Sequence, residues 1–152
     1  MNSFLKLLHL AGVIVWIGGM FFAHFCLRPV ATTQLLPPQR LPLLCAVLGR
    51  FFVAVTASIV AILLSGLAIM LPLGMASAPL HWHIMLTLGL PMIVIFSIIV
   101  LHHYPRLKGR VAASDWPAAG QSMNRIRVLV ATNLAIGAVT VVVATVGSYV
   151  WN

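Results

Sequence analysis

The chain has 152 residues, of which 62% are hydrophobic and only 7% are charged. Soluble globular domains carry about a quarter charged residues, so the composition excludes that class and indicates an integral membrane protein. Nine Lys and Arg stand against a single acidic residue, Asp115. This composition disfavours hydrolysis by a carboxylate pair or triad. It excludes a carboxylate proton relay and a calcium site.

Four apolar runs predict four transmembrane helices. The runs lie at about 4–26, 50–73, 83–101 and 128–150, and each reaches the roughly 20 residues that cross a bilayer. We expect helices at about 3–27, 44–72, 82–104 and 121–151, forming one transmembrane domain over residues 1–152. The alternating pattern of a membrane barrel is absent, so the predicted fold is an all-α integral membrane four-helix bundle.

One face of the first helix combines a possible ligand with bulky and small residues. His9, Trp16 and Met20 fall within a narrow arc at about 100° per residue, and Gly12 and Gly19 flank it. Such a face is typical of a flat cofactor pocket. The alternative is an ordinary helix-packing face in which the histidine is hydrogen-bonded to a neighbouring carbonyl.

Small residues predict how the second and fourth helices pack. The two stripes are Ala54, Ser58, Ala61, Ser65 and Ala68, and then Asn133, Gly137, Thr140, Ala144 and Gly147. We expect Asn133 to be hydrogen-bonded across a helix interface. The prolines at 37, 38 and 42 are expected to rigidify the first connection, and Arg50 to mark where the second helix enters the membrane.

The six histidines fall into two groups by depth. His9, His81 and His83 lie toward one end of the first and third helices, and His24, His102 and His103 lie toward the other. Facing imidazoles across a bundle core typically hold a b-type haem, which makes His9 with His83, or His24 with His102, the candidate ligand pairs. His81 and His103 are expected to be interfacial polar groups.

Two further kinds of residue belong to this haem interpretation. Trp16 and Met20 would wall the pocket. Arg50, with Arg28 and Arg106, would hold the haem propionates, although arginines there serve equally as topology anchors.

The basic residues predict the orientation of the chain. Arg28, Arg40 and Arg50 surround the first connection, a second group surrounds the third, and the second connection has none. The positive-inside rule then places both termini on the periplasmic side of a bacterial inner membrane. The charge excess is thus mostly topological, and no nucleic-acid partner is expected. A secondary role on anionic headgroups or acidic cofactor groups stays open, because Arg50, Arg106 and Arg127 lie where helices meet the interface. Cys26 and Cys45 lie near the reducing cytoplasmic face, so we expect free, buried thiols.

Several short segments resemble a known family. They are the segment from His9 through Trp16 to Gly19, then Gly49-Arg50-Phe51, Ser65-Gly66-Leu67, Leu80 to His83, and Arg125 and Arg127 followed by Asn133 and Gly137. Together they resemble the copper-resistance-protein-D (CopD) family and, more distantly, the membrane protoporphyrinogen oxidases of the HemJ type. The oxidase resemblance implies a haem ligand at His9. This chain differs from the oxidases where they have a third-helix lysine and a fourth-helix glutamate, at His83 and Leu134.

Three functions follow from these patterns. The first is a haem-b redox protein, such as an oxidoreductase, that exchanges electrons with a quinone, porphyrin or radical substrate. The second is a CopD-like copper transport or tolerance protein in which histidines and the methionines at 20, 70, 75, 85 and 92 hand on a soft cation. The third is a noncatalytic accessory subunit. A homo-oligomer or a larger membrane complex is compatible with each.

Overall fold

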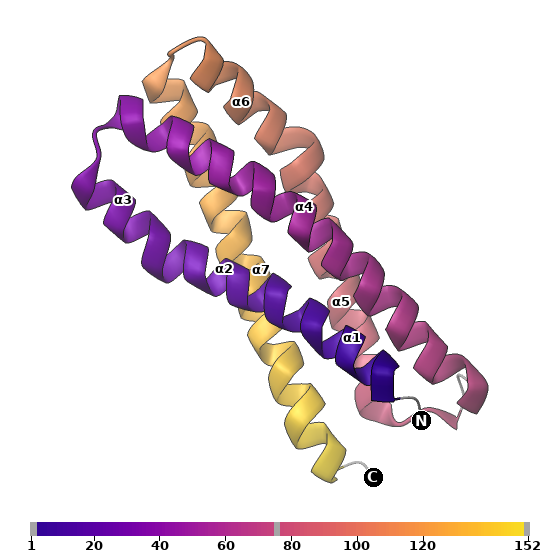
Figure 1. The fold of residues 1–152 in the computed structure, drawn as a ribbon. Helices are drawn as coiled ribbons and strands as arrows, with labels where there is room; N and C mark the ends of the chain where they lie inside the picture. Colours follow the sequence, from indigo (N-terminus) through magenta and orange to yellow (C-terminus); the bar gives the residue numbers. More distant parts are fainter. Residues whose placement is uncertain (1–2, 75–76, 151–152) are drawn as a thin grey trace.

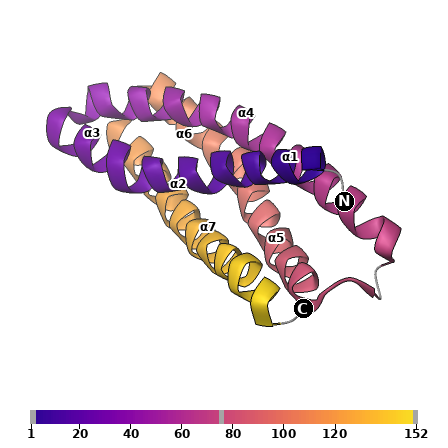
Figure 2. The same ribbon diagram turned by 60° about the horizontal axis from the view of Figure 1, so that its bottom comes forward.

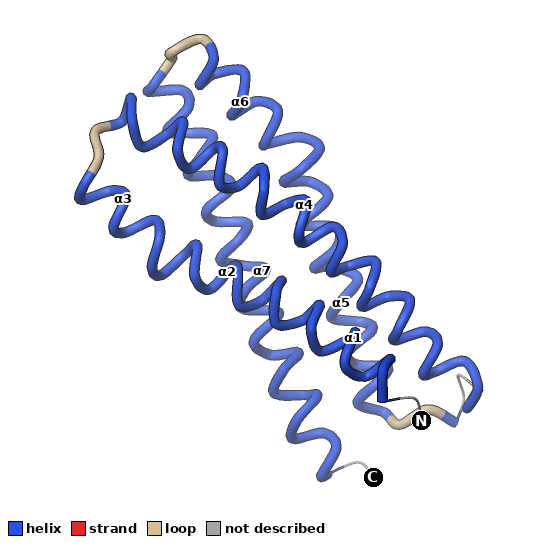
Figure 3. The backbone as a smooth tube through the Cα atoms, in the orientation of Figure 1, coloured by secondary structure: helices blue, strands red, loops and turns tan. Residues whose placement is uncertain are grey.

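Four long helical rods form the molecule. The computed structural model describes residues 3–74 and 77–150, and within these ranges the chain is helical apart from short connections (Figures 1 and 3). The rods Ser3–Gln34, Pro37–Met70, Leu80–Ala112 and Trp116–Val150 are each long and apolar enough to cross a membrane. The expected all-α membrane bundle is confirmed.

π-helical turns interrupt two of the rods. The first rod consists of α1 (Ser3–Val13), η1 (Ile14–Gly18), α2 (Gly19–Phe21), η2 (Phe22–Leu27) and α3 (Arg28–Gln34). The second is α4 (Pro37–Met70), which ends in the short 3₁₀ turn η3 (Leu71–Leu73). The third consists of α5 (Leu80–Ile98), η5 (Ile99–His103) and α6 (Tyr104–Ala112), and the fourth is α7 (Trp116–Val150).

The first connection is much shorter than the sequence indicates. Only Leu35 and Leu36 separate α3 from α4. Pro37 and Pro38 lie in the first turn of α4, where a backbone N–H has no partner within the helix and proline is therefore tolerated. The helix continues through Pro42. The expectation that these prolines lie in the connection was therefore wrong.

The rods pack as two pairs. The first rod lies against α4 through α1, and α5 lies against α7 (Figure 1). The start of α1, the end of α4, the start of α5 and the end of α7 share one end of the bundle. We call it the outer end and the opposite end the inner end, after the predicted topology. Figure 2 shows α5 and α7 diverging from α1 and α4 toward the outer end.

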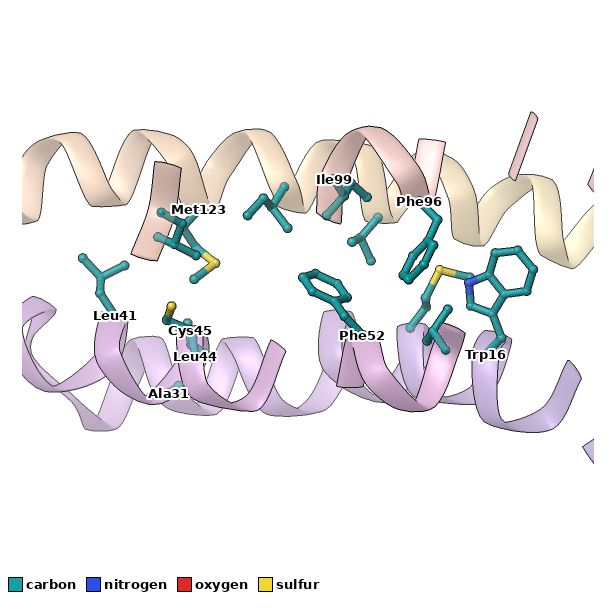
Figure 4. Packing of buried hydrophobic residues seen from close by; sticks show 14 of the residues in the cluster. Trp16, Ala31, Leu41, Leu44, Cys45, Phe52, Phe96, Ile99 and Met123 are labelled. Carbon is teal, nitrogen blue, oxygen red and sulfur yellow. The ribbon is translucent and has the colours of Figure 1, made fainter. Parts of the chain in front are cut away.

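Aromatic rings join the two pairs in the middle of the bundle. The rings of Trp16 and Phe96 meet edge-on with centroids 6.3 Å apart, and Phe96 meets Phe52 at 5.9 Å (Figure 4). Gly137 of α7 adds a close approach, since a Cβ there would lie 3.2 Å from side-chain atoms of Ile17 and Met92. The core thus runs through all four rods, while many large apolar side chains remain exposed, as lipid contact requires.

The small-residue stripes are only partly at interfaces. Ser58 and Ser65 on α4 are buried, as are Asn133, Gly137 and Gly147 on α7. Ala54 and Ala68 are exposed instead. The serine, asparagine and glycine positions of the stripes therefore lie at helix interfaces, whereas some of the alanines do not.

Hydrogen bonds hold the turn between α6 and α7 at the inner end of the bundle. Arg110 Nη1 donates hydrogen bonds to the Ala118 carbonyl at 2.8 Å and to Ser122 Oγ at 2.7 Å. Asp115 Oδ1 accepts from the Ala118 N–H at 3.1 Å, which caps the start of α7. The single carboxylate side chain is therefore engaged in a structural role.

Candidate metal site

His9 is held by α4. Its half-buried ring lies near the outer end of α1, where Nδ1 is 3.2 Å from the Ile62 carbonyl oxygen and 3.1 Å from Ser65 Oγ. Gly66 allows this approach, because a Cβ at that position would lie 3.3 Å from His9 Cε1. Ser65 and Gly66, which are adjacent in the sequence, thus form the surface against which the imidazole packs.

The partners of Nδ1 define the tautomer of His9. A backbone carbonyl can only accept, so Nδ1 carries the proton. Ser65 Oγ donates to the Ala61 carbonyl at 2.5 Å, which leaves its lone pairs for the imidazole. In the neutral ring Nε2 is then unprotonated, and it has no hydrogen-bond partner in the described part of the chain. Metal-binding histidines are oriented in this way by a carbonyl on the other nitrogen.

A buried methionine, Met70, follows on the face of α4 against which His9 packs. It lies four residues after Gly66 on α4, about 6 Å along the axis toward the outer end and on the same helical face. Its side chain is 5% exposed. The sequence includes Met70 among several methionines but does not single it out. The signal was its helical spacing from Gly66, which has meaning only once His9 is known to pack there.

The predicted flat pocket beside His9 is filled by α4. A Cβ on Gly12 would lie 2.8 Å from Ile62 Cγ1, and one on Gly19 would overlap the Phe51 ring. The two glycines therefore admit side chains of α4. Of the two readings of this face, the helix-packing face with a carbonyl-bonded histidine is the one observed.

The outer histidines of α5 differ from each other. His83 is half-buried in the first turn, where its carbonyl accepts from Thr87 Oγ1 at 2.8 Å. His81 is only 6% exposed, and its Nδ1 has no hydrogen-bond partner among the residues that the structure describes. Its position at the membrane interface stays a prediction, but its side chain is buried within the bundle. Its burial depends on how α5 lies in the bundle, which the sequence does not reveal.

The inner histidines lie on different rods and have different neighbours. His24, in η2, lines a cavity and meets the Phe25 ring edge-on at 4.8 Å. His102 is exposed and its ring contacts that of His103 at 5.3 Å. Across residues 3–74 and 77–150, no hydrogen bond or ring contact joins His24 to His102, or His9 to His83.

The other predicted site residues divide between core and surface. Trp16 and Met20 are buried in the central core. Arg50 is exposed on α4. Cys45 is buried and Cys26 is exposed, both as free thiols, so the expectation of a buried Cys26 was wrong.

Asn133 is a buried polar residue whose expected partner is missing. The residue is 1% exposed, and Oδ1 accepts no hydrogen bond from the part of the chain that the structure describes. The prediction of a cross-interface hydrogen bond was therefore wrong.

We expect Asn133→Leu, which keeps the branching at Cγ, to stabilise the protein. Removing an unsatisfied buried carbonyl is worth about 1–3 kcal/mol. Thermal unfolding in detergent should show a higher midpoint for Asn133→Leu, with Asn124→Leu, at an exposed position of the same helix, as control. A lower midpoint for Asn133→Leu alone would mean that the amide makes an essential interaction.

Within the described ranges, no three His, Cys, Asp or Glu side chains cluster as metal ligands would. Thioether sulfur, which methionine would supply, favours Cu(I), and imidazole suits copper and zinc.

A comparison with protein families decides the family. The family model described as copper resistance protein D matches residues 45–146, which is more than half of the chain. The chain belongs to the CopD family. The matched part of this CopD protein begins at Cys45 and so contains Met70, His81 and His83 but not His9. Comparisons with curated proteins and with solved structures find no match.

Proposed function

We propose that this CopD-family protein binds Cu(I) as cargo at the outer end of its bundle, in copper uptake or copper tolerance. The observation that carries the proposal is the orientation of His9. Its Nδ1 is occupied by α4, and its Nε2 has a lone pair without a hydrogen-bond partner among the described residues 3–74 and 77–150. Membership of the CopD family supports copper as the metal.

His9 and Met70 are the proposed ligands. An imidazole nitrogen and a thioether sulfur are neutral, so they bind Cu(I) without bringing a negative charge into the membrane. Two neutral ligands also hold the ion less firmly than a set of thiolates would. Such a site suits an ion that is passed on rather than stored.

A haem-b redox function is the competing interpretation, and it uses His9 differently. Haem would need a second axial ligand, from His83 for example, and space for a porphyrin between the helices. The cavity that His24 lines has a volume of about 140 Å³, whereas small-molecule and cofactor pockets occupy roughly 300–1,000 Å³. The inner cavity is thus too small for haem, and the Gly12 and Gly19 surface is occupied by α4.

Titration of the detergent-purified protein with Cu(I), against a chromophoric competitor, tests the proposal. We expect stoichiometric Cu(I) binding by the wild-type protein and its loss in His9→Gln, which keeps a polar side chain but removes the ring nitrogen. The matched control is His103→Gln at the inner end, which should bind copper normally.

The absorption spectrum of the same preparation separates the two functions. The copper interpretation predicts no Soret band. A Soret band that sharpens on reduction and disappears in His9→Gln would instead establish the haem interpretation and refute the copper one. Neither copper binding nor a Soret band would favour the accessory role.

A further inference from the structure

Three arginines lie near one another toward the inner end of the bundle. Arg28 begins α3, Arg40 lies in the first turns of α4, and Arg127 lies on α7. Arg40 and Arg127 are close enough for their positive charges to act on the Arg28 guanidinium. No ion pair or side-chain hydrogen bond engages the three guanidinium groups in the residues that the structure describes. Asp115 is occupied at the start of α7.

Two adjoining cavities open beside these arginines. The larger, of about 140 Å³, is lined mainly by apolar side chains of the first rod, α4 and α7, with Arg28 and Arg127 among them. The smaller, of about 90 Å³, is polar, and its lining includes Arg28, Thr32, Arg40 and Asn124. Arg28, Leu44 and Met123 line both. An apolar space and a positively charged space are therefore joined.

We propose that these cavities bind one anionic phospholipid. Its phosphate lies among Arg28, Arg40 and Arg127, and the upper part of an acyl chain lies in the apolar cavity along Phe22, Leu48 and Phe51. Arginine forks match phosphate oxygens, and basic pockets between transmembrane helices near the cytoplasmic side are suited to anionic headgroups. The predicted orientation puts the inner end in that leaflet.

The shape of the site favours a lipid over a free phosphate ion. A free phosphate would pair with the arginines but leave the adjoining apolar cavity unfilled. A lipid satisfies both, because its charge and its hydrocarbon are covalently joined in the order in which the two cavities follow one another. Binding would also bridge the first rod, α4 and α7, which supply the three arginines.

Native mass spectrometry of the delipidated full-length protein tests this directly. We compare phosphatidylglycerol with phosphatidylcholine of the same acyl chains, and expect preferential retention of phosphatidylglycerol. Arg40→Gln and Arg127→Gln should each weaken phosphatidylglycerol binding about fivefold. Arg125→Gln, at an exposed position two residues from Arg127, is the matched control and should bind normally.

A second variant separates the lipid from its headgroup. Ala23→Leu places a larger side chain in the apolar cavity and leaves all three arginines in place. We expect it to lose phosphatidylglycerol binding while its unfolding midpoint without lipid stays close to wild type. Phosphatidylglycerol should raise the wild-type midpoint, and inorganic phosphate at the same concentration should not.

Three results would overturn the proposal. They are equal retention of phosphatidylcholine, an equal loss of binding in Arg125→Gln, and a stabilisation by inorganic phosphate that matches that of the lipid. The last would identify a site for a free anion only.

Discussion

Gly12→Val should destabilise the protein by about 1–3 kcal/mol and remove most of its copper binding. A Cβ at position 12 would lie 2.8 Å from Ile62 Cγ1 and 3.0 Å from the Ser58 carbonyl oxygen. The carbonyl belongs to the backbone of α4 and cannot turn aside as a side chain can. The valine therefore forces α1 away from α4, which separates His9 from the Ile62 carbonyl.

Gly18→Val is the matched control for this prediction. Gly18 lies in the same rod, and a Cβ there would meet nothing within 4 Å. Thermal unfolding and Cu(I) titration of both variants in the same detergent provide the comparison. Equal behaviour of the two would show that close contact between α1 and α4 does not support the site.

Met70→Leu should weaken Cu(I) binding at least about tenfold. Loss of a residue that only supports a ligand already costs about tenfold in metal affinity, and loss of a ligand should cost no less. Stability should change little, because a methionine-to-leucine exchange nearly conserves volume and usually costs less than about 1.5 kcal/mol. The expected result is thus a protein that folds normally and binds copper poorly.

Met123→Leu provides the control for the Met70 variant. Met123 is also buried, at 7% exposed against 5% for Met70, but it lies toward the inner end. The Met123→Leu variant should bind Cu(I) as the wild-type protein does. If the Met70 and Met123 variants bind equally well, Met70 is not a ligand and a different sulfur must be sought near His9.

Hydropathy was sufficient to predict the class of fold. Four long apolar runs in a chain with so few charges leave helices as the only way to satisfy the backbone in lipid. The helix ends were harder, because α4 begins at two prolines that look like a connection. Proline is tolerated in a first turn, so its presence alone does not locate the end of the preceding loop.

The candidate site was only half accessible from the sequence. His9 was singled out by its depth and its helical face, but its partners Ile62 and Ser65 are more than fifty residues away. Which α4 residues it meets depends on the register of two packed helices. That register is set by close fits such as Ile62 against Gly12, which composition does not encode.

Histidines at a similar depth in the membrane can point in different directions. Depth follows from 1.5 Å of rise per residue, whereas direction around the axis follows from 100° of turn per residue. His24 lies in η2 and His102 in η5, and a π-helical turn inserts a residue and rotates the side chains that follow. Residues at similar depth therefore need not face each other, and His102 is exposed.

X-ray absorption at the copper edge of the Cu(I)-loaded protein tests the central claim most directly, since it identifies the atoms bound to the metal. The account predicts both nitrogen and sulfur neighbours in the wild-type protein, loss of the sulfur in Met70→Leu, and no bound copper in His9→Gln. A copper site with the same neighbours in the wild-type protein and both variants would contradict it.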